Sequence, residues 1–331
     1  MSGSSDRRAF LAGLGAAAIT TAAVGCSAAS QADSARAPGA GSTSKRPARQ
    51  RPARRREDGS RDLKKAVKLN MVQGDETVSD LTVKQKFALL VELGFDGVEL
   101  DSPGDLSTAE VLAAQDATGL AVHGVVDSVH WRKPLSHPDP AVRAEGQAAL
   151  QTALRDAKVW GASSVLLVPA VVDKNVAYDE AWERSLAEIM KATPLAEELG
   201  VDILLENVWN GFLLSPLEAR QFVDATESAR VGWYLDVGNL VNFGWPEQWA
   251  RILGDRVGKL DIKEYSRARR NADGLWEGFK VELLEGDCNW PAVMETMDEI
   301  GFTGWCTAEI PGGERQRLAD IAERMDRIFA A

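Results

Sequence analysis

Short apolar segments alternate with amphipathic segments along most of this chain, and few folds accommodate such a pattern. Each apolar segment is bounded by Gly or by turn residues and predicts a buried parallel strand. These segments span residues 67–72, 97–100, 121–126, 164–168, 201–206, 231–236, 258–262 and 304–310. A helix-like segment follows each of them, the last over residues 315–329. Eight such units within residues 66–331 predict a single-domain α/β protein, a (β/α)₈ TIM barrel.

A doubly wound open sheet is the alternative fold, although no predicted strand precedes the Gly-rich phosphate-binding sequence typical of that fold. A faint internal repeat favours the barrel. Residues 93–100 (Leu-Gly-Phe-Asp-Gly-Val-Glu-Leu) parallel residues 300–309 (Ile-Gly-Phe-Thr-Gly-Trp-Cys-Thr-Ala-Glu). Both segments predict a helix end, a Gly stop, a tight turn and a strand, which is the joint that a repeated strand–helix unit needs.

The first 65 residues differ in composition from the rest. Residues 1–30 predict an export signal of the twin-arginine type, because Arg7 and Arg8 precede an almost uncharged stretch of small residues. That stretch is too short and too rich in Ala and Gly for a good transmembrane helix. Residues 23–26 (Ala-Val-Gly-Cys) resemble a lipoprotein cleavage site. We therefore expect the protein in the periplasm or at the cell surface, either free or held by a lipid on Cys26.

Residues 31–65 are rich in Ala, Pro, Gly, Ser and Arg, which predicts a disordered basic linker. Residues 1–65 contain 13 Lys or Arg and 5 Asp or Glu, so residues 66–331 carry 25 basic and 44 acidic residues. A domain this acidic repels a nucleic-acid backbone, and a small neutral substrate suits it better. Beyond Cys26 only Cys288 and Cys306 remain, too few for a disulfide framework or a CxxC zinc site.

Four acidic residues stand at the ends of four predicted strands: Glu206, Asp236, Asp261 and Glu309. The carboxyl ends of barrel strands meet at one edge, where ligands bind. Burying a carboxylate is costly unless something positive meets it, so four at one edge predict a bound cation. An oxygen-only ligand set favours Mg²⁺ or Mn²⁺ over zinc. The alternative is that each acid caps a helix or pairs with Arg or Lys.

Two predicted connections are too long to be simple turns, residues 127–140 and residues 264–289. Long loops at the edge of a barrel usually cover or line the site. His123 in the third strand and His130 in the first long loop are candidates for hydrogen bonds to a sugar, although either is as easily a satisfied core histidine. Trp131 could stack on a sugar ring.

Several motifs resemble those of the xylose-isomerase-like sugar phosphate isomerase/epimerase superfamily, in which D-tagatose and D-psicose 3-epimerases are well understood. They are Glu206-Asn207, Asp236-Val-Gly-Asn239, Asp261-Ile-Lys-Glu-Tyr-Ser-Arg267 and Ala308-Glu309. The resemblance implies a TIM barrel, a divalent metal and interconversion of sugars through an enediolate. It implies metal ligation by Glu206, Asp236 and Glu309, with the two glutamates as the catalytic proton-transfer pair.

The chain departs from that family at two positions. Asp261 stands where the third metal ligand is normally a histidine, which adds negative charge. Lys263, on the same strand face, is expected to offset that charge. Asn239 stands where relatives often carry a substrate-binding histidine, so a different sugar preference is expected. Arg267 matches a residue that contacts substrate hydroxyls, and Lys263 is a further basic candidate for substrate contact.

The leading hypothesis is therefore a metal-dependent isomerase or epimerase of a sugar or sugar derivative. A lyase or dehydratase acting on keto-sugars or 3-keto-glycosides shares the same first proton abstraction, so the motifs do not separate the two. A third possibility is a carbohydrate-binding barrel that has lost its chemistry, which the aspartate at position 261 favours. A phosphodiesterase with several zinc ions needs more histidines than the three in this chain.

Overall fold

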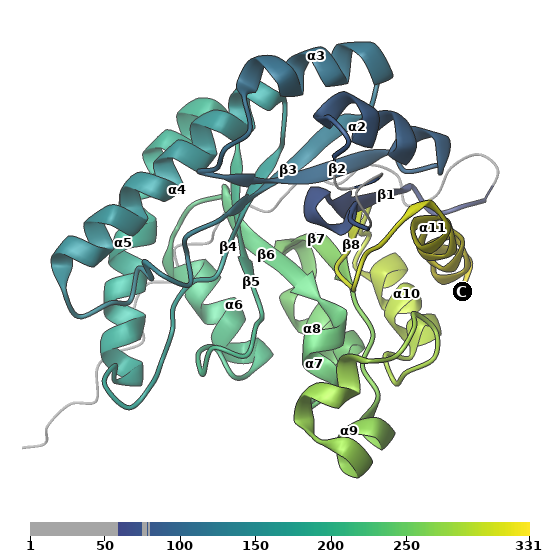
Figure 1. Ribbon diagram of the computed structural model, residues 1–331. Helices are drawn as coiled ribbons and strands as arrows, with labels where there is room; N and C mark the ends of the chain where they lie inside the picture. Colours follow the sequence, from purple (N-terminus) through teal and green to yellow (C-terminus); the bar gives the residue numbers. More distant parts are fainter. Residues whose placement is uncertain (1–58, 75–77, 79) are drawn as a thin grey trace, which may run out of the picture. The chain divides into compact units, whose positions relative to one another are not determined.

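The computed structural model describes residues 59–331 except for residues 75–77 and 79 (Figure 1). The predicted export signal, the lipid-anchor residue Cys26 and most of the predicted linker lie outside the described residues. In the part of the chain that is described, no helix is both long enough and apolar enough to cross a membrane.

Eight parallel strands close into a barrel in sequential order, as predicted. The strands are β1 Leu63–Lys68, β2 Gly97–Ser102, β3 Ala121–Asp127, β4 Ser164–Leu167, β5 Asp202–Glu206, β6 Val231–Asp236, β7 Val257–Ile262 and β8 Gly304–Ala308. Closure is direct, because β1 pairs with β8 from Leu63↔Gly304 to Val67↔Ala308. This pairing excludes the doubly wound open sheet, whose end strands do not meet.

Helices surround the barrel and cover its outer face (Figure 1). They are α2 Val83–Glu92, α3 Thr108–Thr118, α4 Pro140–Trp160, α5 Tyr178–Leu199, α6 Pro216–Ala225, α7 Val237–Val241, α8 Pro246–Leu253, α9 Arg267–Asp273, α10 Trp290–Glu299 and α11 Arg315–Ala330. Short 3₁₀ turns lie at η1 Leu69–Met71, η2 Gly254–Arg256 and η3 Leu275–Phe279. Local sequence explains the helix starts. Thr82 and Gln85 form a capping box at α2, for example, and Ser215 caps α6 ahead of Pro216.

The first strand begins earlier than predicted, at Leu63 instead of Val67. The flanking lysines made this segment look like linker, yet Leu63, Ala66 and Val67 are buried. Lys65 reaches outward to an ion pair with Asp326 at 2.7 Å. The strand ends at Lys68, and Leu69–Met71 directly after it form a 3₁₀ turn. This shift places a lysine at the carboxyl end of β1.

The predicted internal repeat corresponds to two equivalent helix–strand joints. Gly94 after α2 and Gly301 after α10 both adopt positive φ, 80° and 67°. In each joint the next residue, Phe95 or Phe302, donates its N–H to a carbonyl five residues back, at 3.0 Å and 2.8 Å. Glycine adopts this left-handed conformation without a Cβ clash, which explains why both segments carry it.

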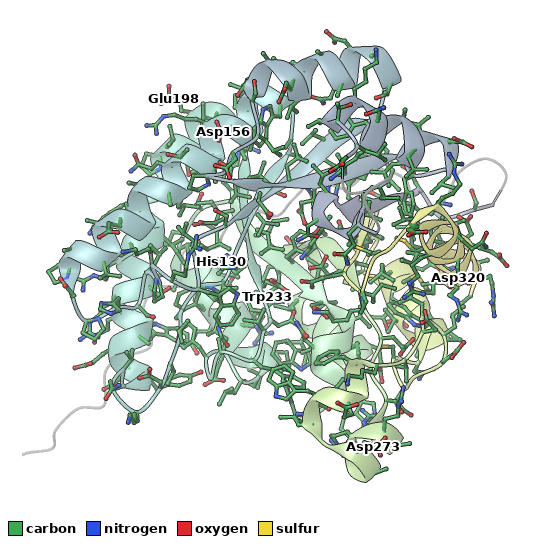
Figure 2. All side chains as sticks on the ribbon, viewed as in Figure 1. His130, Asp156, Glu198, Trp233, Asp273 and Asp320 are labelled. Atoms are coloured by element: carbon green, nitrogen blue, oxygen red, sulfur yellow. The ribbon has the colours of Figure 1, made fainter. Side chains whose placement is uncertain are left out.

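The main hydrophobic core lies between the strands and the surrounding helices. Trp233 is fully buried there, whereas Glu198 and Asp273 lie at the periphery in Figure 2. A second, small cluster of Leu166, Leu204 and Tyr234 fills the inside of the barrel. Side chains therefore plug the barrel, and a ligand can enter only at one of its open ends.

Candidate active site

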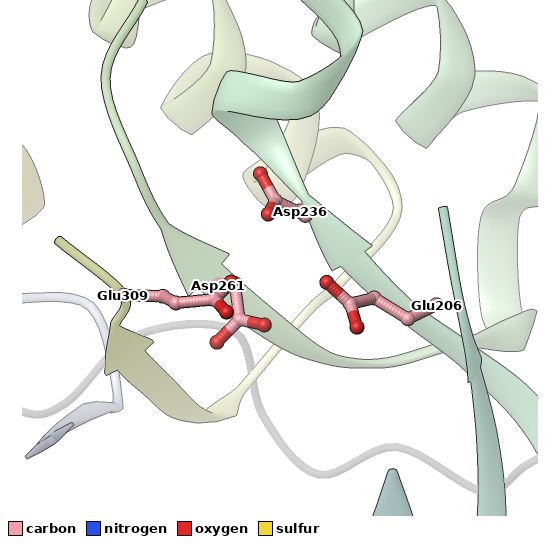
Figure 3. Close-up of side chains that lie close together, drawn as sticks. All are labelled: Glu206, Asp236, Asp261 and Glu309. Carbon is pink, nitrogen blue, oxygen red and sulfur yellow. The ribbon is translucent and has the colours of Figure 1, made fainter. Parts of the chain in front are cut away.

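The four acidic residues predicted from the strand ends come together at the carboxyl edge of the barrel. Glu206 and Asp236 are the last residues of β5 and β6, Asp261 is the last but one of β7, and Glu309 directly follows β8. Each offers one carboxylate oxygen, and these four oxygens lie within 4.8 Å of one another. Figure 3 shows Glu206 and Glu309 reaching toward each other from opposite sides, with Asp236 and Asp261 between them.

Asn207 holds the end of β6 in place. Its side chain accepts a hydrogen bond from the Asp236 N–H at 3.1 Å and donates to the Asp236 carbonyl at 2.7 Å. Asp236 Oδ1 in turn accepts from the Asn239 N–H at 2.8 Å, which caps the short helix α7. One oxygen of Asp236 is therefore structural, and the other is directed at the cluster.

Two lysines also belong to this cluster. Lys68 at the end of β1 forms ion pairs with Glu309 at 3.0 Å and with Asp261 at 3.4 Å. Lys263, just after β7, pairs with both Asp236 and Glu309 at 3.0 Å. The alternative that the acids pair with basic residues thus holds in part. Among the described residues, none forms an ion pair with Glu206.

The cluster nevertheless fits a divalent cation. When all four carboxylates are ionised, as metal ligands must be, they and the two ammonium groups carry a formal charge of minus two. Asp261 Oδ1 is buried without a hydrogen-bond partner, and each carboxylate oxygen that meets a lysine has a further lone pair to offer. Oxygen donors of this kind suit Mg²⁺ or Mn²⁺. The acidic cluster could therefore hold a divalent metal.

The two glutamates differ in protonation. Burial and then the nearby charge of Glu309 raise the pKa of Glu206 well above its usual value. Burial also opposes ionisation of Glu309, but the ammonium groups of Lys263 and Lys68 outweigh it and lower its pKa. Burial opposes the charge of Lys68 and Lys263 as well, but the carboxylates of the cluster outweigh it and raise the pKa of both lysines. Both side chains therefore stay charged. One glutamate therefore favours its neutral form and the other its ionised form.

A cavity of about 520 Å³ opens above the cluster. Lys68, Glu206, Asn239, Lys263 and Glu309 line its inner part. Both long connections contribute to it, as predicted. Residues 127–140 supply His130 and Trp131, and residues 264–289 supply Trp276, Phe279 and Lys280.

His130 is the one predicted histidine that lines the cavity. Its Nδ1 accepts a hydrogen bond from the Val168 N–H at 3.2 Å, so the proton of the neutral ring resides on Nε2. Burial, followed by the charge of Lys68, lowers the pKa of His130 to about 3. His130 therefore stays neutral at physiological pH and offers one N–H donor.

The structure does not bring His123 into the cavity. Its ring lies inside the barrel, where Nδ1 accepts from Lys259 Nζ at 3.0 Å and Nε2 meets Thr307 Oγ1 at 3.1 Å. Trp305 stacks on it with ring centroids 4.5 Å apart. His123 thus matches the alternative of a satisfied core histidine, because both of its nitrogens are already in use.

Arg267 also lies away from the cavity lining. Its guanidinium donates to the Gly244 carbonyl at 2.9 Å and stacks over Trp245 at 5.4 Å. Asn239 does line the cavity, but its amide donates to the Asn207 carbonyl at 3.1 Å and its Oδ1 is 3.4 Å from Lys263 Nζ. Of the five predicted substrate contacts, the structure therefore brings His130, Asn239 and Lys263 to the cavity.

Lys68 pairs with the cluster but was not among the residues predicted from the sequence. The reason is the position of β1: a strand placed at residues 67–72 puts Lys68 inside the strand, whereas the observed strand ends at it. The signal was present, since a charged residue at a strand end is the same pattern that identified the four acids.

Comparisons with known proteins agree with this geometry. Residues 87–330 match the family model described as xylose isomerase-like TIM barrel. L-ribulose-5-phosphate 3-epimerase UlaE of Salmonella heidelberg (strain SL476) is 25% identical over 276 residues, which cover 78% of this chain and 94% of that protein. Such relatives are sugar epimerases.

Solved structures share the fold. Escherichia coli 3-keto-D-glucoside 4-epimerase YcjR, in its apo form, superimposes with a TM-score of 0.67 at 16% identity and covers 81% of this chain and 100% of its own. The IOLI protein with a bound zinc atom gives a TM-score of 0.65 at 15% identity, covering 81% and 98%. At 15–16% identity, the likeness to these two structures shows a shared fold alone.

Proposed function

Because this chain belongs to the xylose isomerase-like TIM barrel family, we propose that it is an isomerase or epimerase of a sugar or sugar derivative. The observation that carries the proposal is the placement of Glu206 and Glu309, which enter one cavity from opposite sides. Proton transfer on both faces of a substrate carbon requires two such groups. The epimerase activity of the relatives supports the same assignment.

In this proposal a keto-sugar binds with its carbonyl and the neighbouring hydroxyl toward the carboxylate cluster. One glutamate removes the proton from the carbon beside the carbonyl, which gives an enediolate. The other glutamate returns a proton to the opposite face and inverts that carbon. Lys68 and Lys263 hold Glu309 in position through both of its oxygens. His130 Nε2–H donates a hydrogen bond to a sugar oxygen.

We further propose that the cluster binds Mg²⁺ or Mn²⁺ through Glu206, Asp236, Asp261 and Glu309. A divalent ion held there would polarise the substrate carbonyl and acidify the adjacent C–H bond. Asp261 differs from the histidine expected at this position. It contributes a negative charge that a histidine would lack, and Lys68, rather than Lys263 as expected, meets this charge at 3.4 Å.

A lyase that acts on 3-keto-glycosides is the second candidate. The observation that favours it is the extent of the cavity beyond the cluster, where aromatic side chains from two loops leave room for a substituent on the sugar. Loss of that substituent after the same proton abstraction would give elimination.

Isotope exchange tests the proposed proton transfer. Ketopentoses, ketohexoses and a 3-keto-glycoside are each incubated with metal-loaded protein in D₂O. A substrate of the enzyme should incorporate deuterium at the carbon beside its carbonyl. Glu206→Gln preserves shape but cannot exchange the proton, and we expect a loss of about 10²- to 10⁴-fold. Glu110→Gln, on the exposed face of α3, is the matched control. Full exchange by Glu206→Gln would refute a proton-transfer role for Glu206. Release of the aglycone from the 3-keto-glycoside by the native protein would identify a lyase.

We also propose that the protein is exported by the twin-arginine route, on the basis of Arg7 and Arg8 ahead of the small-residue stretch. This route carries folded proteins, which suits an enzyme that acquires its metal in the cytoplasm. Cell fractionation with an Arg7→Lys, Arg8→Lys variant tests the proposal. The variant should remain in the cytoplasm.

A further inference from the structure

Four aromatic side chains surround the outer part of the cavity: Trp131, Trp209, Trp276 and Phe279. We call this set the aromatic mouth. Trp209 follows β5, and its ring centroid lies 4.8 Å from that of Trp276 and 5.0 Å from that of Phe279. The Trp209 indole N–H donates to the Asn239 carbonyl at 2.8 Å, which fixes the orientation of this ring in the cavity lining.

Two members of the aromatic mouth are unusually exposed. Trp276 is 66% exposed and Trp131 is 48% exposed, although both carry large apolar surfaces. Exposed aromatic side chains at the opening of a pocket usually mark a binding surface. Their flat faces attract other flat rings, either aromatic rings or the C–H face of a sugar.

The charges of the cavity argue against a phosphate group. Of the described residues that line it, three are lysines, and each already meets a carboxylate. Lys68 and Lys263 pair with the cluster, and Lys280 pairs with Glu277 at 2.7 Å. His130 is neutral. A phosphate would meet the carboxylates of Glu206 and Glu309, while the three lysines of the described lining already pair with carboxylates.

We propose that the aromatic mouth is a second subsite, which binds a flat uncharged ring attached to the sugar, so that the substrate is a glycoside and not a sugar phosphate. This inference rests on the proposed function, because it assumes that the reacting sugar occupies the carboxylate cluster. The ring is an aromatic aglycone or a second sugar, which share a flat face that stacks on indole.

Calorimetric titration of the full chain tests the subsite without any turnover. The probes are methyl β-D-glucoside, 4-nitrophenyl β-D-glucoside, cellobiose, glucose and glucose 6-phosphate. The nitrophenyl glycoside, cellobiose or both should bind about tenfold more tightly than the methyl glycoside. The ratio of the affinities for the nitrophenyl glycoside and for cellobiose shows whether the subsite prefers an aromatic ring or a second sugar. Glucose 6-phosphate should bind no more tightly than glucose.

Trp276→Ala should remove most of that preference. Leu275→Ala is the matched control, because Leu275 is 44% exposed in the same turn but does not line the cavity. Equal affinity for the methyl and ring-bearing glycosides, no measurable binding of the latter, or preferential binding of glucose 6-phosphate would overturn the subsite. Isotope exchange by Glu206→Gln is measured separately, so failure of the proposed chemistry is distinguishable from failure of the subsite.

Discussion

At the scale of single residues, Asp127 shows how strongly burial alone acts on a carboxylate. Asp127 ends β3 and is 1% exposed. Its carboxylate accepts one hydrogen bond, from the Val129 N–H at 3.1 Å, and no ion pair to it occurs among the described residues. Burial raises the pKa of Asp127 to about 7, against the opposing effect of the backbone hydrogen bond. Asp127 therefore differs from Asp236, Asp261 and Glu309, each of which pairs with a lysine.

This raised pKa makes a pH-dependent prediction. Folding favours the neutral form of Asp127, so its contribution to stability is greatest below the ordinary pKa and is lost as pH rises toward 7. Asp127→Asn removes the ionisation and keeps the acceptor for Val129. We expect it to change the free energy of unfolding little near pH 4 and to raise it by up to about 4 kcal/mol at pH 8.

Urea unfolding of both proteins at the two pH values measures this difference. The sign follows from linkage, because the unfolded chain releases the Asp127 proton at lower pH than the folded one does. A stability difference that is the same at pH 4 and pH 8 would contradict the explanation.

At the scale of elements, the joints between helices and strands position the site. Gly94 and Gly301 turn the chain from α2 into β2 and from α10 into β8, and β8 leads directly to Glu309. Both turns need a residue in the left-handed backbone conformation. The boundary of β1 matters in the same way, since it decides that Lys68 reaches the cluster.

Gly94→Ala tests the left-handed joint. A Cβ at this position would meet only Lys65 Nζ at 3.8 Å, so steric contact adds little and the cost is conformational. We expect a loss of about 1–2 kcal/mol in the free energy of unfolding. Gly94→Asn should cost less, because Asn tolerates this conformation better. Equal losses for the two variants, or none, would show that the joint relaxes.

At the scale of the whole molecule, barrel closure brings distant parts of the chain into one site. The cluster combines β5 to β8 with Lys68 from β1, so it exists only once β1 has paired with β8. A ligand of the cluster therefore binds the folded barrel and not the unfolded chain, and it should stabilise the entire fold.

Metal addition gives the corresponding prediction. At a free Mn²⁺ concentration of about 100 times the dissociation constant, folding should gain about 2.7 kcal/mol and the melting temperature should rise. Thermal unfolding with Mn²⁺ and with a chelator measures the gain. Asp236→Asn keeps the cap on Asn239 but removes a charge from the cluster, and it should lose most of the gain. An unchanged melting temperature in the native protein would argue against the proposed metal site.

Much of this architecture follows from local pattern. The alternation of apolar and amphipathic segments predicts the barrel, because each segment's periodicity depends only on nearby residues. Parallel strands share one direction, so acids at the ends of four strands must face the same edge. The clustering of Glu206, Asp236, Asp261 and Glu309 could for this reason be predicted without coordinates.

Contacts between strands depend instead on how the barrel closes. The pairing of Lys68 and Lys263 with the carboxylates, and the separate fates of His123 and His130, follow from strand stagger and from which side chains point inward. The aromatic mouth likewise combines side chains from loops that are far apart in the sequence. Periodicity along a sequence reports the face on which a residue lies, whereas its partners across the barrel are determined only by the tertiary packing of all eight strands.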